Sequence, residues 1–163
     1  MGAGLVQTGH TFPDFTLSDL NGASRSTADA RSKGLLLVAF FKVNCPTCQL
    51  TFPYLQKLAD ACPTLTVWGV SQNDAMETRA FERDYGTSFP MLLDKGLEVT
   101  DRFDLQSVPA MYLTDESGVV LEYMGAWSKD FVNGIARRVA ERTGTAPEVP
   151  VTDADRVPVF TPG

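Results

Sequence analysis

The sequence predicts a single α/β domain built around a central mixed β-sheet, and three observations lead to that prediction. Two short apolar runs, residues 35–41 and 65–70, suit strands that are buried on both faces of a sheet. A helical pattern separates these two runs. Residues 110–123 then read as two strands joined by a turn, with a further helix behind them. Strands that alternate with helices in this way indicate an α/β architecture.

Composition supports a globular domain and excludes several function classes. A chain of 163 residues with 44% hydrophobic and 21% charged residues is long enough for one domain with a true core. The net charge of −6 comes from scattered acidic residues, without a basic stripe, so we expect no nucleic-acid partner and no binding to an anionic membrane. Three cysteines are too few for a disulfide scaffold.

The first segment of the chain predicts little regular structure. Residues 1–11 are expected to be a flexible lead-in, and they lack the basic and apolar regions of a signal peptide or membrane anchor. We therefore expect a cytoplasmic protein, although a chain from which an export signal had been removed would look the same. The apolar residues between 12 and 17 predict a short strand, residues 19–22 a turn, and the small polar residues 23–34 a loop.

The central feature is a strand, a tight turn and a helix between residues 34 and 62. After the apolar run come Cys45-Pro46-Thr47-Cys48, and a helical stripe begins at Cys48 and continues to Cys62. Pro46 suits the first helical position, where its missing N–H costs nothing. The two cysteines of this Cys-x-x-Cys motif therefore lie at the N-terminus of a helix.

That position activates a thiol. Unpaired backbone N–H groups and the helix dipole favour an anion there, and cysteine pKa values in such motifs fall to roughly 3.5–7.5. Cys45, at the exposed end, is the candidate nucleophile. Cys48, nearly one turn later and facing inward, is placed to attack a mixed disulfide formed at Cys45. Two thiols at this spacing suit dithiol–disulfide exchange.

The second half of the chain supplies further elements. The pair Asp74 and Glu77 resembles a capping box that opens a helix to about Tyr85. The other expected elements are a short strand at 89–93, a short helix at 96–103, strands at 110–114 and 119–123 around a turn, and a helix after Trp127. We expect one domain over residues 1–142, followed by a Pro-rich tail, residues 143–163, that is extended or disordered.

Taken together, these residues resemble the thioredoxin-like superfamily, in particular its TlpA-like and AhpC-TSA (redoxin) branch. The matching features are the opening strand at 10–17, the Cys45–Cys48 motif, Pro53 within the helix, the helix–strand insertion at 72–93, and Val108-Pro109 before the hairpin. The resemblance implies a three-layer α/β/α sandwich with a central mixed sheet, an N-terminal extension and that insertion.

The resemblance also implies a substrate-binding role for Val108 and Pro109. The family places a cis-proline here, facing the active site, and proline accepts the cis form at little cost. Val108 would then present its backbone to an extended substrate segment beside Cys45, together with Pro46 and Thr47. The alternative is an ordinary trans turn into the hairpin.

Several positions depart from the family pattern. Ala39 stands where thioredoxins bury an Asp, and Thr51 stands where many TlpA-like proteins carry a Glu, so the sequence does not identify the group that takes the proton of Cys48. Asn44 replaces a frequent Trp. Lys42 is placed to stabilise a thiolate, but a strand-end lysine that extends into water is the more ordinary arrangement.

The remaining alternatives differ in their chemistry. A peroxiredoxin needs a Thr or Ser where this chain has Lys42, and a Pro where it has Val38. Arg102 is a candidate for the arginine partner of a peroxidatic cysteine, but the sequence does not place it near Cys45. A zinc site would need more ligands than Cys62 and His10 supply, so we expect Cys62 to fill the core and no metal to bind. A third reading is a binding module whose cysteines are incidental.

The sequence therefore predicts a thiol–disulfide oxidoreductase in which Cys45 exchanges disulfides with protein substrates and Cys48 resolves the mixed disulfide. No metal or organic cofactor is required, since the thiols carry the electrons. We expect a monomer without a membrane segment that depends on an upstream redox partner.

Overall fold

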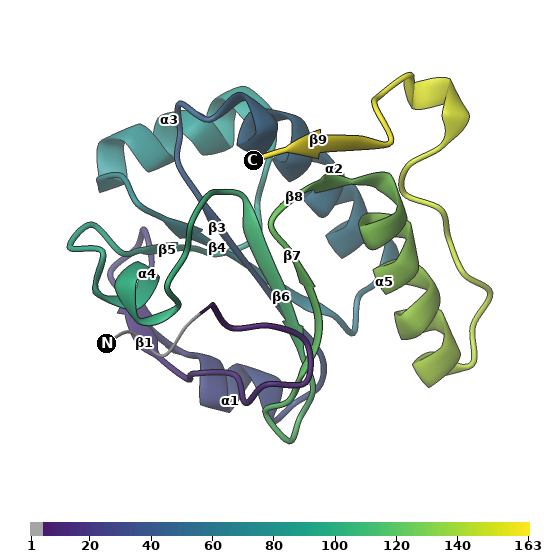
Figure 1. Cartoon of the computed structure of the whole chain (residues 1–163), viewed down its shortest axis with the longest axis horizontal. Helices are drawn as coiled ribbons and strands as arrows, with labels where there is room; N and C mark the ends of the chain where they lie inside the picture. The colour runs from purple at the N-terminus through teal and green to yellow at the C-terminus, as the bar shows by residue number, and fades with distance from the viewer. Residues whose placement is uncertain (1–4) are drawn as a thin grey trace.

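The computed structural model of the chain describes residues 5–163, and a five-stranded mixed sheet lies at its centre (Figure 1). The helices and strands, in chain order, are β1 Thr16–Ser18, β2 Ser24–Ser26, α1 Thr27–Arg31, β3 Leu36–Phe41, α2 Pro46–Ala61, β4 Thr66–Ser71, α3 Ala75–Tyr85, β5 Met91–Leu93, α4 Glu98–Arg102, β6 Ala110–Thr114, β7 Val120–Met124, β8 Ala126–Ser128, α5 Lys129–Thr143, the 3₁₀ turn η1 Asp153–Asp155 and β9 Phe160–Pro162.

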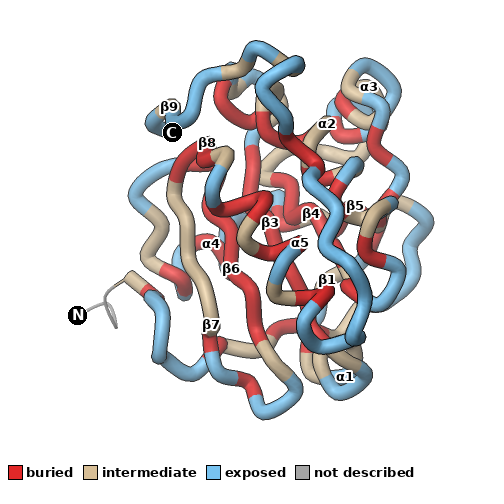
Figure 2. Tube along the Cα trace, turned by 90° about the vertical axis from the view of Figure 1, so that its right-hand side faces the viewer, coloured by how far each residue is buried: buried red, intermediate tan, exposed pale blue. Residues whose placement is uncertain are grey.

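The central sheet has the strand order β5-β4-β3-β6-β7. Strand β3 pairs in parallel with β4 and antiparallel with β6, so the predicted mixed sheet is confirmed. All six residues of β3 are buried, as expected for a continuous apolar run in the middle of a sheet (Figure 2). Because β3 is central, the cysteine motif that follows it lies at the middle of one end of the sheet.

Neighbouring aromatic residues of β3 show how the two faces of the sheet are covered. Phe41 packs on Phe52 of α2, with ring centroids 4.3 Å apart, and on Phe81 of α3 at 4.7 Å. Helix α5 lies against α2 on this side. Phe40 points to the opposite face, where it meets Phe15 of the N-terminal segment and Phe103, directly after α4. Helical and N-terminal layers therefore sandwich the sheet, as the resemblance implies.

The prediction of a loop at residues 23–34 is wrong. This segment forms β2, which pairs antiparallel with β1, and the short helix α1. The Ser26 side chain caps α1 by accepting the Asp29 N–H, and the buried Thr27 hydroxyl bonds to Asp14 and to the backbone of Phe15. These partners lie up to 13 residues away in sequence, so local composition did not reveal them.

The N-terminal lead-in is more structured than expected where it is described. Residues 1–4 lie outside the described part of the chain. Val6 is buried, the Gly9 N–H donates to the Val120 carbonyl, and the Val120 N–H donates to the carbonyl of His10. The expectation of a flexible lead-in therefore fails for residues 5–11.

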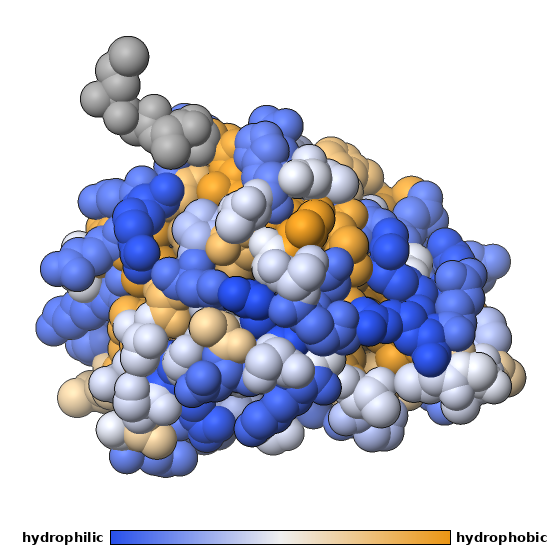
Figure 3. Space-filling view, turned by 90° about the horizontal axis from the view of Figure 1, so that it is seen from below, coloured by the Kyte–Doolittle hydropathy of each residue, from blue (hydrophilic) through white to orange (hydrophobic). Residues whose placement is uncertain are grey.

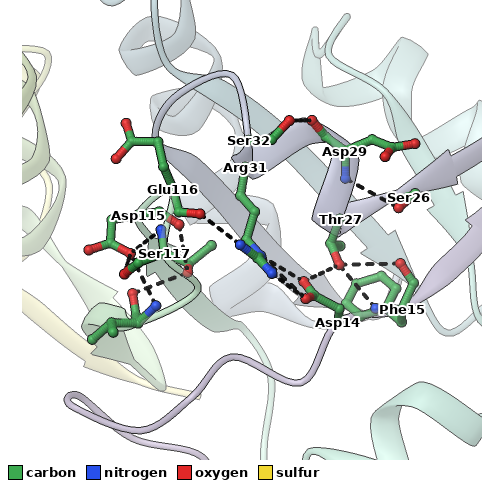
Figure 4. A network of polar contacts seen from close by, with 12 residues as sticks. Asp14, Phe15, Ser26, Thr27, Asp29, Arg31, Ser32, Asp115, Glu116 and Ser117 are labelled. Carbon is green, nitrogen blue, oxygen red and sulfur yellow. Dashed lines mark hydrogen bonds and ion pairs between the residues drawn. The ribbon is translucent and has the colours of Figure 1, made fainter.

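Arg31 connects three segments at the end of the sheet where β3 begins (Figure 4). Its guanidinium donates to both carboxylate oxygens of Asp14 and, at 2.7 Å, to the backbone carbonyl of Glu116 in the β6–β7 turn. Figure 3, seen from below, shows mainly hydrophilic residues over this end of the molecule. The cysteine motif follows the other end of β3, so Arg31 and the cysteine motif lie at opposite ends of the strands of the sheet.

The later elements from α3 to β7, and helix α5, agree with the sequence analysis, whereas strand β8 was not expected. Helix α3 is capped by Asp74, whose side chain accepts the Glu77 N–H at 2.9 Å, and strands β6 and β7 form the predicted hairpin. Within residues 5–163, no helix is both long enough and apolar enough to cross a membrane.

The tail, residues 143–163, follows a defined and mostly exposed path. It leaves the end of α5, runs back along that helix, turns at η1 and returns across the top of the molecule (Figures 1 and 2). Its last strand, β9, pairs antiparallel with β8. The tail therefore ends beside the region where α2 begins.

Candidate active site

Helix α2 begins at the cysteine motif, as predicted. Cys45 has an extended backbone and is the N-cap residue, and its sulfur accepts the Cys48 backbone N–H at 3.1 Å. Pro46 occupies the first helical position. The Cys45 thiol is half-buried and sits where the unpaired N–H groups and the helix dipole favour a negative charge.

Cys48 lies beneath Cys45 and is fully buried. Burial raises the pKa of the Cys48 thiol well above its usual value, and the adjacent Cys45 sulfur raises this pKa further. A hydrogen bond from the Lys42 backbone and the positive charge of its side chain lower the pKa of Cys48 in part. The two thiols therefore differ strongly in environment, one open to substrate and the other shielded.

The Val108–Pro109 peptide bond is cis, as the resemblance predicted. The Val108 carbonyl oxygen lies 3.6 Å from the Cys45 sulfur and accepts a hydrogen bond from the Cys45 thiol. The structure thus brings Cys45, Cys48, Val108 and Pro109 together from two segments more than 60 residues apart.

Pro46 and Thr47 occupy different environments within the motif. Pro46 is exposed, whereas Thr47 and Val108 are each only 9% exposed. The Thr47 hydroxyl donates to the backbone carbonyl of Pro162, in β9, at 2.8 Å. Sequence reasoning missed this contact, because nothing in the local pattern of the tail indicates where its last residues lie.

The positions that depart from the family pattern also have clear environments. Ala39 is fully buried within β3, so the position at which thioredoxins bury an Asp holds an apolar side chain here. The Thr51 hydroxyl donates to the Thr47 carbonyl at 2.7 Å, one turn earlier in α2. The Thr51 hydroxyl is therefore engaged by the backbone of its own helix. The charge of Lys42 lowers the pKa of Cys48.

The remaining candidate residues lie outside this cluster. Cys62 is 5% exposed at the far end of α2, where burial raises the pKa of its thiol, as expected of a core residue. The His10 ring accepts the Gln7 N–H, and Arg102 donates to the backbone carbonyl of Asp14. In the described part of the chain, no three His, Cys, Asp or Glu side chains gather closely enough to hold a metal ion.

Comparison with known proteins agrees with this geometry. The model of the AhpC/TSA family matches residues 8–123, a span that includes both cysteines and the cis-proline. The chain belongs to the AhpC/TSA family. Its tail lies outside the matched span.

Two relatives are about 30% identical to the chain over the aligned residues. The thioredoxin-like protein YneN of Bacillus subtilis is 32% identical over 130 residues, which cover 76% of this chain and 75% of YneN. The thiol-disulfide oxidoreductase ResA of Halalkalibacterium halodurans is 30% identical over 121 residues, which cover 72% of this chain and 68% of ResA. The similarity extends over most of each protein.

Solved structures show the same thioredoxin-like fold. The thioredoxin domain of a thiol-disulfide oxidoreductase from Bacteroides vulgatus matches 82% of this AhpC/TSA chain and 99% of its own, with a TM-score of 0.74 and 25% identity. A secreted disulfide oxidoreductase of Mycobacterium tuberculosis matches 78% of the chain and 95% of its own, with a TM-score of 0.67 and 25% identity.

Proposed function

We propose that this AhpC/TSA-family protein is a thiol–disulfide oxidoreductase that exchanges disulfides with protein substrates through Cys45 and Cys48. The observation that carries the proposal is the pairing of a half-buried thiol at the N-cap of α2 with a buried thiol one turn later. The thiol-disulfide oxidoreductases among its relatives and structural neighbours support the same chemistry.

The first step is attack by Cys45 on a substrate disulfide. The Cys45 thiolate forms a bond to one substrate sulfur, the substrate S–S bond breaks, and the second substrate sulfur leaves as a thiolate that takes up a proton. The Cys48 N–H stabilises the Cys45 anion, because it already points at this sulfur. The Val108 carbonyl beside Cys45 offers a backbone partner to the substrate chain.

The second step is resolution by Cys48. Its thiolate attacks the Cys45 sulfur, the Cys45–Cys48 disulfide forms, and the remaining substrate sulfur leaves as a thiol. In the mixed disulfide Cys45 has lost its charge, so one of the influences that raise the pKa of Cys48 disappears at the step that needs the Cys48 thiolate. In total, two electrons and two protons pass from the enzyme dithiol to the substrate disulfide, and oxidation of a substrate is the reverse.

Substitution of the three cysteines tests this proposal. Cys45→Ser should reduce insulin disulfide reduction to the uncatalysed background. Cys48→Ser should accumulate a mixed disulfide at Cys45, visible on non-reducing electrophoresis. Cys62→Ala is the matched control and should keep activity within about twofold, because Cys62 lies outside the site. Activity that survives in Cys45→Ser would refute the proposal, and unchanged partner binding alone would favour the binding module.

The direction of electron flow is measured by the reduction potential of the Cys45–Cys48 pair. A value near about −270 mV indicates a thioredoxin-type reductant, and a value near about −120 mV indicates an oxidant. We further propose that the protein works as a monomer, that an upstream dithiol or disulfide protein regenerates it, and that it is cytoplasmic. Light scattering during size-exclusion chromatography tests the first of these.

Thiol-dependent peroxidase activity is the second candidate, and the AhpC/TSA match favours it. Against it, Lys42 and Val38 replace the Thr or Ser and the Pro that the peroxiredoxin motif needs. Stopped-flow measurement of hydrogen peroxide consumption separates the two candidates. We expect Cys45 to react with peroxide at the slow rate of a simple thiol.

A further inference from the structure

The tail is fastened to the body of the protein some way before its last strand. Asn133 of α5 is buried, and its side-chain amide makes two hydrogen bonds with the backbone of Val151, at 2.9 and 3.0 Å. Val151 itself is fully buried. Residues beyond this anchor pass through η1, where Asp155 and Asp153 form ion pairs with Lys57 and Lys129 on the surface.

Beyond that anchor, residues 157–163 reach the active site itself. Strand β9 pairs with β8, with Trp127 opposite Thr161, and Pro162 accepts the hydrogen bond of the Thr47 hydroxyl between the two cysteines. Gly163 lies against the carbonyl that Cys45 contacts, since a methyl group on its Cα would stand 2.5 Å from the Val108 oxygen. The Gly125 carbonyl would be 3.0 Å away from the same methyl group.

These contacts cover the backbone that an extended substrate would use. Val108 and Thr47, two of the predicted substrate-binding residues, are nearly inaccessible, and Pro162 and Gly163 lie directly against them. The arrangement is that of strand addition, in which a peptide runs along an exposed strand edge and bonds to its backbone. Here the peptide is a segment of the same chain.

The same segment is held by few contacts. Strand β9 has only three residues, and the side chains of Val159 and Phe160 remain 61% and 56% exposed. The Trp127 indole N–H donates to the Pro158 carbonyl at 2.6 Å, which adds one side-chain bond to the β8–β9 ladder. Val157 packs partly against the core, but the exposed side chains of Val159 and Phe160 lose little buried apolar area when β9 leaves. Its release is therefore inexpensive compared with opening the core.

We propose that β8, Val108 and Thr47 form a binding edge for an extended segment of a protein substrate, and that residues 157–163 occupy this edge as a built-in competitor. The inference rests on the proposed function and names its substrate class, because a small disulfide reaches the half-buried Cys45 without the edge, whereas an extended protein segment requires it. The alternative is that residues 157–163 are a permanent wall of the site.

Deletion of residues 157–163, compared with the full chain, separates these two arrangements. The deletion should raise the rate of insulin disulfide reduction about tenfold, the equivalent of one to two net hydrogen bonds. It should leave the rate toward the small disulfide 5,5′-dithiobis(2-nitrobenzoate) within about twofold, since that reagent does not use the edge. An unchanged or lower insulin rate beside an intact small-disulfide rate would overturn the proposal in favour of a wall.

A full-length variant guards against a deletion that fails to fold. Trp127→Phe keeps an aromatic ring against Tyr54 but removes the donor to Pro158, so it should raise the insulin rate in the same direction by a smaller factor. Trp68→Phe in β4, outside the tail contacts, is the matched control and should leave the rate unchanged. Equal effects of both variants would count against the proposal.

A binding experiment decides the inference without any redox activity. A synthetic peptide of residues 157–163 is titrated into Trp68→Phe versions of both proteins, in which Trp127 is the only tryptophan. Followed by tryptophan fluorescence, it should bind saturably to the deletion variant and not to the full chain. Binding to neither protein, or equally to both, would overturn the proposed edge. If neither the full chain nor the deletion variant shows Cys45-dependent disulfide reduction, the proposed function fails. The peptide titration still decides whether the tail occupies a peptide-binding site.

Discussion

Cys48 has the least favourable place in the site for a charge, and Lys42 is the residue that offsets this. The Cys48 thiol is fully buried, so its anion loses the solvation that water would give. Lys42 lies at the end of β3, with its side chain exposed, and its charge lowers the pKa of Cys48. The charge of Lys42 therefore favours the resolving step. The sequence alone offered two interpretations of Lys42, a role at the thiolate or a solvated strand end.

Replacing Lys42 should slow resolution and shift its pH dependence. Lys42→Gln removes a positive charge that favours the Cys48 thiolate, so the pKa of Cys48 rises and the step requires a higher pH. We expect the mixed disulfide at Cys45 to decay about threefold more slowly at pH 7, since an exposed charge acts through screening water. Rapid-quench measurement of this decay between pH 6 and pH 10 checks the prediction.

Lys33→Gln provides the control for charge alone. Lys33 is also exposed but precedes β3 at the opposite end of the sheet from Cys45. Its replacement should leave the pH profile in place. If both variants slow the decay equally, the effect is one of net charge and Lys42 has no local role.

At the scale of elements, the sequence predicted those whose signals are local. Seven consecutive apolar residues identify β3, and the Cys-x-x-Cys motif followed by a helical stripe identifies the start of α2. The short helix α1 was missed, because its cap and the buried Thr27 make sense only once Asp14 is placed beside them. Strand β9 was missed for the same reason, as it depends on pairing with Trp127, which lies 31 residues before Pro158.

The candidate site divides in the same way. Cys45, Cys48 and the cis Val108–Pro109 bond follow from short motifs and a family pattern. The contact of Pro162 with Thr47 joins residues 115 positions apart, and a proline-containing segment without periodicity gives no sign of its destination.

Helix α3, part of the insertion, should depend on its N-cap for stability. Asp74→Ala removes the acceptor of the Glu77 N–H and leaves that N–H without its side-chain partner. The expected loss is about 1 kcal/mol of unfolding free energy. Urea denaturation should show a lower midpoint with an unchanged slope.

Asp84→Ala, in the last turn of the same helix, is the control for losing a carboxylate. Asp84 is 60% exposed and lies near the negative end of the helix dipole, so its removal should be neutral or slightly stabilising. A loss equal to that of Asp74→Ala would contradict the capping role.

Across the whole molecule, the ion pair of Asp14 and Arg31 connects the N-terminal segment, α1 and the β6–β7 turn. The hydrogen bond from Arg31 is the main cause that lowers the pKa of the Asp14 carboxyl in the folded protein. A lowered folded-state pKa means that the contribution of Asp14 to stability is complete above its unfolded pKa of about 4. The contribution is lost as the pH falls through the folded-state value.

Asp14→Asn should therefore destabilise the protein at pH 7 but not in strong acid. We expect a loss of about 1 kcal/mol at pH 7, because the carboxylate is 33% exposed and the pair is partly screened. The difference between the variant and the natural chain should shrink below about pH 4. Urea titrations at pH 7, 5 and 3 measure this. Glu141→Gln, on the exposed end of α5, should show no such pH dependence.

The anchor of Val151 on Asn133 has a consequence for any substrate that competes with β9. A strand tethered by the eight residues between Val151 and Phe160 stays near its partner at an effective concentration in about the millimolar range. A free peptide of the same intrinsic affinity must therefore reach millimolar levels to displace β9. Protein substrates that add contacts elsewhere on the surface overcome this threshold, and small random peptides do not.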